Sequence, residues 1–183
     1  EETVGCYRRA GLWRHLVSVG ICARLMAMRL KFANFEDMFL AGLLHDIGIV
    51  FEDQYAHGPF VAAIQSLQSQ KPLTEIEREH LEFDHTMVGE RVAEMWGFPE
   101  PMKVAVRYHH ATPGYQGEHI DILRCVELAN LICSVKGISS VGVCLVKVCQ
   151  GTLAAMSLAK NDLLVLSEDL DREIEQNSTL FQT

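Results

Sequence analysis

The sequence has little of what several protein classes require. It contains six cysteines but no C-x-x-C pair, no run of 18 apolar residues, and only 16 basic residues against 24 acidic ones. Its first four residues form neither a basic segment nor an apolar one. A zinc or disulfide framework, a membrane span, a secretory signal and broad contact with a nucleic-acid backbone are therefore not expected. We expect a cytoplasmic protein that contacts neither membranes nor nucleic acids.

The composition indicates one globular, all-helical domain. Of the 183 residues, 49% are hydrophobic and 22% are charged, a balance typical of a folded core. No repeat, linker or low-complexity tract divides the chain, so residues 1–183 are predicted to form a single all-α domain. Apolar residues recur along most of it at the period of a helix. The spacing predicts helices over 12–30, 36–47, 60–67, 74–81, 85–96, 101–108, 119–135, 141–156 and 163–174.

Three local signals define helix ends in this prediction. Gly48 is interpreted as the C-cap of the second helix, which puts the pair His45-Asp46 in the last turn of that helix. Thr74 and Glu77 have the spacing of a capping box that would begin the helix over 74–81. Asp84 is a candidate N-cap for the helix that follows.

Histidine is the unusual component of this sequence. Eight are present, and six of them lie between His45 and His110. His45-Asp46 and His109-His110 form adjacent pairs at predicted helix ends, where the negative end of the helix dipole favours a cation. His15 and His85 lie near the starts of two more helices. Four helices thus each offer a ligand, as a metal site inside a helical bundle requires. The histidines predicted to lie in loops or on the surface are His57, His80 and His119.

Several motifs resemble a known family. The segment Gly42-Leu43-Leu44-His45-Asp46-Ile47-Gly48, preceded by Trp13-Arg14-His15, is similar to the HD superfamily of metal-dependent phosphohydrolases. Asp84-His85, Trp96-Gly97-Phe98-Pro99 and Tyr108-His109-His110 resemble one branch, the HDOD domain, an output domain of bacterial signalling proteins. The resemblance covers about residues 12–177. It implies a single HD-domain-like helical bundle of bacterial origin, without some of the helices that usually precede this region in the family.

The resemblance also implies one or two divalent transition-metal ions. In related enzymes an aspartate from a later helix joins the first ligand set, and here that position is Asn130. A neutral amide oxygen is a weaker ligand than a carboxylate, so the first position should be weaker or empty. Imidazole-rich sites accept Fe, Mn, Ni and Zn alike. The implied sets are His15, His45 and Asp46 for the first ion, and Asp46, His85, His109 and His110 for the second.

The cyclic-dinucleotide phosphodiesterase branch, HD-GYP, fits this sequence less well. In that branch a glutamate follows the His-His pair, and a Gly-Tyr-Pro motif comes shortly after. Here Ala111 follows the pair, and Gly114-Tyr115-Gln116 lacks the proline. The residue four positions before His15, which can be an acidic metal ligand in that branch, is Gly11. We therefore do not assign cyclic-dinucleotide hydrolysis.

Two functions remain open from the sequence. The preferred one is a signalling module that binds a regulatory protein partner or a nucleotide-like ligand, because the departures at Asn130 and Ala111 weaken the case for an enzyme. The alternative is a metal-dependent phosphohydrolase acting on a nucleotide-like phosphomonoester or phosphodiester through a metal-bound water. Asp46 would then be the catalytic bridging ligand, and Arg14 and Arg107 would be candidate substrate-binding cations.

The oligomeric state is also open. Met95, Trp96 and Phe98 could form the surface of a homodimer. Large apolar side chains at helical spacing more often lie in a core, so we predict that these three are buried.

Overall fold

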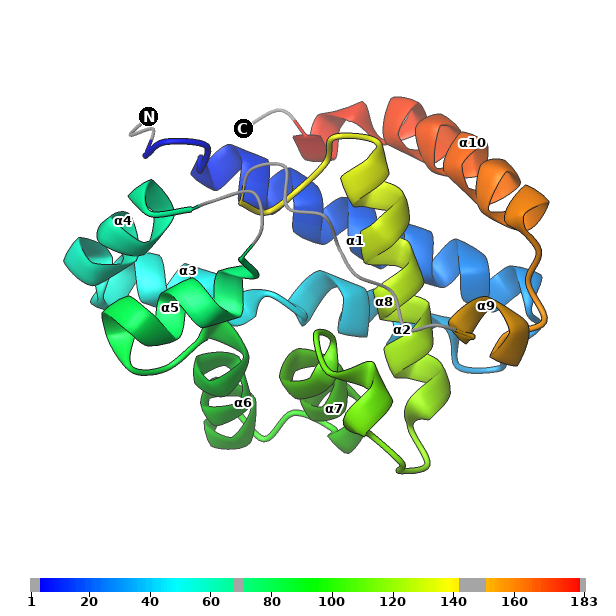
Figure 1. Ribbon diagram of the computed structural model, residues 1–183. Coiled ribbons are helices and arrows are strands. Elements are labelled where there is room, and N and C mark those ends of the chain that lie inside the picture. Colours follow the sequence, from blue (N-terminus) through cyan, green and yellow to red (C-terminus); the bar gives the residue numbers. More distant parts are fainter. Residues whose placement is uncertain (1–3, 68–70, 142–150, 182–183) are drawn as a thin grey trace.

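The computed structural model describes residues 4–67, 71–141 and 151–181, which form an all-α bundle (Figure 1). No strand occurs in these ranges, apart from an isolated antiparallel bridge between Val4 and Tyr7. The predicted all-helical fold is confirmed. None of the described helices is long and apolar enough to cross a membrane. The elements are α1 (Arg9–Arg29), α2 (Phe35–Leu44), α3 (Ile47–Tyr55), α4 (His57–Gln65), α5 (Leu73–Leu81), α6 (His85–Met95), α7 (Glu100–Tyr108), η1 (Thr112–Gly114), α8 (Ile120–Val135), α9 (Thr152–Ala155), α10 (Lys160–Gln176) and η2 (Ser178–Phe181).

The long helix α1 runs through the bundle, and α2, α8 and α10 pack around it. Most of its residues between Leu12 and Ala27 are buried, as expected for a helix that is apolar on nearly every side. Two glycines bring α1 and α2 into contact, because a Cβ on Gly42 would lie 2.8 Å from the Cα of Gly20. This contact fixes the end of α2 against the helix that carries His15.

The His-Asp pair lies at a break between two helices. α2 ends at Leu44 and α3 begins at Ile47, so His45 and Asp46 form the link between them. The prediction that Gly48 caps α2 was wrong, and the helix over 47–55 was not predicted. Gly48 lies in the first turn of α3, where it is required by packing. A Cβ at this position would lie 1.9 Å from the carbonyl oxygen at the start of α6.

The predicted starts of α5 and α6 had different outcomes. Asp84 caps α6 as expected, since its carboxylate accepts hydrogen bonds from the backbone N–H groups of Thr86 and Met87. The capping box at Thr74 and Glu77 was wrong, because α5 begins one residue earlier and has no side-chain cap. Glu77 is fully buried instead. Its carboxylate therefore needs partners inside the protein.

The end of α6 is exposed, which corrects the core prediction for Met95 and Trp96. Their exposed fractions are 71% and 59%, whereas Phe98 is half-buried. Met95 lies on the side of α6 opposite to the buried Ala93, and Trp96 follows the last residue of the helix. The ring of Trp96 packs at the surface, 5.7 Å from the centroid of Phe51 and 5.9 Å from that of Phe98.

Predictions for the C-terminal third are confirmed in part. The helix predicted over 141–156 falls largely on residues 142–150, which lie outside the described ranges; the described remainder contains the short helix α9. α10 confirms the helix predicted over 163–174, and Asp162 accepts a 2.8 Å hydrogen bond from the backbone N–H of Ala159. Residues 178–181 form the short helix η2. The indole N–H of Trp13 donates to the carbonyl of Leu180 at 2.8 Å.

Candidate metal centre

The bundle brings six of the predicted ligand residues together, and we call them the histidine cluster. His15 comes from α1, His45 and Asp46 from the link between α2 and α3, His85 from the first turn of α6, and the pair His109-His110 from the end of α7. Five of the six are at most 4% exposed, and His110 is the most exposed. Their ligand atoms form two groups, each within 4.8 Å: His15, His45 and Asp46, and Asp46, His85, His109 and His110.

The carboxylate of Asp46 lies between the two groups and directs one oxygen towards each. Its Oδ2 atom is 3.4 Å from Nε2 of His45 and 3.7 Å from Nε2 of His15. Its Oδ1 atom is 3.1 Å from Nε2 of His109 and 3.4 Å from Nε2 of His85. One carboxylate therefore joins both groups, which is the arrangement a bridging ligand requires.

One member of the cluster, His110, and one residue outside it, Asn130, lie at its edges. The Nε2 atom of His110 is 3.2 Å from that of His85. Asn130 on α8 is buried, with its amide nitrogen 3.5 Å from Nε2 of His45, and its amide oxygen accepts a 3.3 Å hydrogen bond from Ser134. The position where the family has an aspartate thus belongs to the first group. With an amide at this position, the only carboxylate of the first group is that of Asp46, which also belongs to the second group.

Each buried imidazole is oriented by an acceptor at its Nδ1 atom. When Nδ1 carries the proton, Nε2 is unprotonated, and its lone pair faces the cluster, where it can bind a metal ion. For His85 the acceptor is the carboxylate of Glu77, at 2.7 Å. For the other three rings it is a backbone carbonyl: that of Ile138 for His15 (3.0 Å), of Gly42 for His45 (2.7 Å), and of Ala105 and Val106 for His109 (3.1 and 3.0 Å).

Burial and neighbouring charges set the protonation of the cluster. Burial lowers the pKa of His45 to about 3. The imidazole of His110 is partly buried beside His109 and His85, and this desolvation, followed by the two neighbouring rings, lowers its pKa. Burial alone would raise the pKa of Asp46, but the imidazoles around it, His45 first, hold that pKa well below its usual range. Burial would also lower the pKa of His85, but the charge of Glu77 outweighs it and raises the pKa to about 10. Neutral imidazoles at His45 and His110 beside an ionised carboxylate are the protonation state that metal binding needs, whereas His85 must lose a proton.

The donor set fits a transition-metal ion. The Oδ1 atom of Asp46 is buried with no hydrogen-bond donor among the described residues. Three pairs of Nε2 atoms lie 3.2 to 3.4 Å apart, where unprotonated nitrogens repel unless a proton or a cation lies between them. A divalent cation would satisfy both features. Imidazole nitrogen with a carboxylate oxygen suits Fe, Mn, Ni and Zn.

The two cationic side chains predicted to bind substrate, Arg107 and Arg14, lie in different environments. Arg107 forms an ion pair with Glu90 at 2.9 Å and donates to the hydroxyl of Thr86 at 2.8 Å. Arg14 is exposed on α1. A role for either residue in binding substrate stays a prediction.

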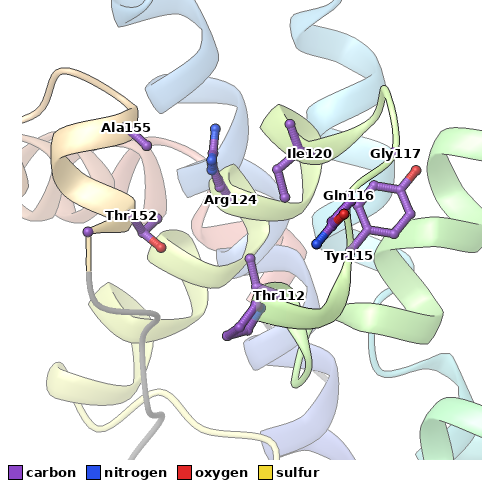
Figure 2. A pocket seen from close by; sticks show the side chains of 10 residues that line it. Thr112, Tyr115, Gln116, Gly117, Ile120, Arg124, Thr152 and Ala155 are labelled. Carbon is purple, nitrogen blue, oxygen red and sulfur yellow. The ribbon is translucent and has the colours of Figure 1, made fainter.

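A cleft whose lining begins shortly after the His109-His110 pair in the sequence was not predicted. It has a volume of about 520 Å³ and lies between η1, the start of α8 and α9 (Figure 2). Its lining begins at Thr112, two residues after the exposed ligand His110. Arg124 lines the cleft, and Asp121 lies 3.3 Å from its guanidinium and balances the charge. A cleft with mixed polar and apolar walls and little net charge suits an uncharged group that forms hydrogen bonds.

The helices and the histidine cluster together define a domain of the HD type. The family model of the HDOD domain matches residues 2–112, more than half of the chain, and the chain belongs to this family. The match includes His15, the His-Asp pair, His85 and the His-His pair, and it ends before Asn130.

Relatives of this chain are longer than the chain itself. An uncharacterised protein of Treponema pallidum (strain Nichols) is 26% identical over 127 residues, which are 67% of this chain and 24% of the relative. A crystal structure of a candidate signal transduction protein from Marinobacter aquaeolei VT8 is 21% identical with a TM-score of 0.82, covering 100% of this chain and 41% of that one.

Two other crystal structures share the fold. An HDOD domain protein of unknown function from Geobacter sulfurreducens is 21% identical with a TM-score of 0.71, covering 97% of this chain and 62% of that one. A candidate phosphohydrolase from Shewanella amazonensis SB2B is 17% identical with a TM-score of 0.73, covering 100% and 66%. At these identities the structures establish the fold alone.

Proposed function

We propose that this chain is a regulatory HDOD domain of a cytoplasmic bacterial signalling protein and that it holds a metal ion in the histidine cluster. The observation that supports this most is the contrast between the two ligand groups. Asp46, His85, His109 and His110 form a complete set, whereas the first group has Asn130 in place of an aspartate. Two-metal hydrolysis uses both ions to hold the attacking and leaving oxygens. An incomplete first group therefore favours regulation over turnover.

In this role the chain's own residues hold the ion and fix its surroundings. The three imidazoles of the second group direct Nε2 inward, and Asp46 supplies the negative charge. Because these residues come from the α2–α3 link, α6 and α7, a bound ion would tie three separate parts of the bundle together. Binding to the folded state alone stabilises it. Metal occupancy could thus control the stability of this part of the bundle.

The alternative is a metal-dependent phosphohydrolase for a nucleotide-like substrate, and one observation favours it. His110 is the exposed member of the cluster, and the cleft begins two residues beyond it. A phosphate that reaches the cluster could therefore carry its organic group into the cleft. A bound divalent ion would supply an activated water and positive charge for the phosphate oxygens. Gln116 and Arg124 offer hydrogen bonds to the organic group.

The proposed partners are a regulatory protein or the same nucleotide-like ligand. The exposed side chains of Tyr55, Met95 and Trp96 on α3 and α6 support a protein contact or a homodimer, since large apolar groups at a surface often mark one. The net charge of −8 argues against binding to nucleic acid.

The test is the metal content of protein purified without added metal or chelator, by inductively coupled plasma mass spectrometry. We expect about one equivalent of a transition metal, lost in Asp46→Ala and retained in His80→Ala, a variant at an exposed histidine outside the cluster. Metal without turnover on a panel of phosphoesters supports the regulatory domain, and turnover that Asp46→Ala abolishes supports the hydrolase. Wild-type protein that is empty and takes up neither Mn²⁺, Fe²⁺ nor Zn²⁺ would refute the metal centre.

A further inference from the structure

Two buried glutamates lie behind the histidine cluster and are not among its ligands. Glu77 on α5 is 0% exposed, and Glu52 on α3 is 1% exposed. Carboxyl groups are rarely buried unless they have a partner, because removing the charge from water is costly. Both side chains therefore need a physical reason for their position, and His85 supplies it for Glu77.

Glu77 holds both the backbone and the ring of His85. Its Oε2 atom accepts a 3.1 Å hydrogen bond from the backbone N–H of His85. The two carboxylate oxygens lie 2.9 and 2.7 Å from Nδ1 of the same residue. With three contacts to one residue, Glu77 fixes the ring direction and keeps the proton on Nδ1. The Nε2 atom is thereby left for the cluster, 3.4 Å from Oδ1 of Asp46.

This arrangement distinguishes His85 from the other buried histidines. The rings of His15, His45 and His109 donate to neutral backbone carbonyls. A carboxylate acceptor makes an imidazole a stronger ligand than a carbonyl does, because its negative charge increases the basicity of the ring. Within the cluster, the ring with the charged partner belongs to the complete second group.

Glu52 is the second of these buried carboxyl groups. No side chain or backbone group in the described residues forms a hydrogen bond with either of its carboxylate oxygens. Burial first, then the charge of Glu77, raises the pKa of Glu52 to about 9. Glu52 is therefore neutral at ordinary pH and is not a second negative charge beside that of Glu77.

We propose that Glu77 is a positioning residue for the metal ligand His85. This inference rests on the proposed metal centre. It assigns to α5, which contributes no ligand to the cluster, the task of presenting one ligand at the second metal position.

The test compares Zn²⁺ binding by wild type, Glu77→Gln and the control Glu79→Gln, using competition with a chromophoric chelator. Glu79 is the matched control, since it lies on the same helix with its side chain 56% exposed beside Lys71. Glu77→Gln should weaken Zn²⁺ binding by about 10–100-fold. Glu79→Gln should not change it.

A second measurement separates positioning from a loss of folding. In nuclear magnetic resonance spectra of the Zn²⁺-loaded protein, His85 should show a downfield Nδ1–H resonance that disappears in Glu77→Gln while the spectrum of the fold persists. Wild-type affinity and an unchanged resonance in Glu77→Gln would overturn the inference. A wild type that binds no metal would instead refute the proposed function, and this inference with it.

Discussion

Replacing Gly48 with alanine should push α3 away from α6 and displace His85. A Cβ at this position would lie 1.9 Å from the carbonyl oxygen of His85 and 2.7 Å from its carbonyl carbon. Unstrained contacts between such atoms are about 3.5 Å. The two helices must therefore separate locally by roughly 1.5 Å. The backbone fixes the position of the alanine Cβ, and the atoms that it meets are backbone atoms of His85. No side-chain rotation can therefore relieve the clash.

The clash should lower both the stability of the protein and its affinity for Zn²⁺. Overpacking of this kind costs about 1–3 kcal/mol, which lowers the melting temperature by roughly 2–12 °C for a chain of this length. Because the backbone N–H and the ring of His85 both bond to Glu77, a shift of the α6 start also moves Nε2 within the cluster. Zn²⁺ affinity should fall about 10–100-fold. Thermal melting of the metal-free protein and a Zn²⁺ titration measure the two quantities separately.

Gly58→Ala is the matched control for this variant. Gly58 lies in the first turn of α4, and a Cβ there would have no atom within 4 Å. Alanine in a helix is favoured over glycine by up to about 1 kcal/mol, so this variant should melt at or above the wild-type temperature. If Gly48→Ala melted like Gly58→Ala and bound Zn²⁺ like wild type, the close approach of α3 and α6 at His85 would be disproved.

Three further predictions follow from buried groups. Asn130→Asp should add a carboxylate beside His45 and raise the metal content towards two equivalents, measured by mass spectrometry. The buried hydroxyl of Thr112 has no hydrogen-bond partner in the described residues, so Thr112→Val should raise the free energy of unfolding by about 1 kcal/mol, whereas Thr152→Val, which loses a 2.8 Å bond to Glu127, should lower it. Burial first, then Glu77, raises the pKa of Glu52 to about 9 from its ordinary 4.5, so the metal-free protein should lose stability as the pH rises between these values. Denaturant titrations should show a smaller loss for Glu52→Gln, and an equal loss would refute this origin.

The sequence was informative about the cluster because metal binding depends on a few residue types, which the sequence shows directly. Histidine beside aspartate at one predicted helix end, and histidine beside histidine at another, indicated a shared site before any fold was known. The structure brings His15, His45, Asp46, His85 and the His109-His110 pair to one place. The identity of Asn130 also separated the two ligand groups in advance. Whether these residues hold an ion stays a prediction.

Helix ends and surface positions were harder to predict, because they depend on what packs against them. Glycine near the end of an apolar segment usually caps a helix, but Gly48 permits the contact with α6 and lies inside α3. The run of large apolar residues at Met95 and Trp96 has the composition of a core, yet both are exposed because the helix ends there. In each position the decisive partner is distant in the sequence.

Glu77 shows most clearly what local reasoning cannot reach. Three residues after Thr74, it has the spacing of a capping-box glutamate, and a charged residue in a short helix is usually solvated. Its burial is explained by His85, eight residues away in the next helix, whose backbone N–H and ring both contact the carboxylate. The imidazole in turn depends on the glutamate, since without that acceptor its Nδ1 proton would be buried unpaired. The acid and the histidine thus account for each other's burial, and neither role can be assigned before the packing of α3, α5 and α6 is known.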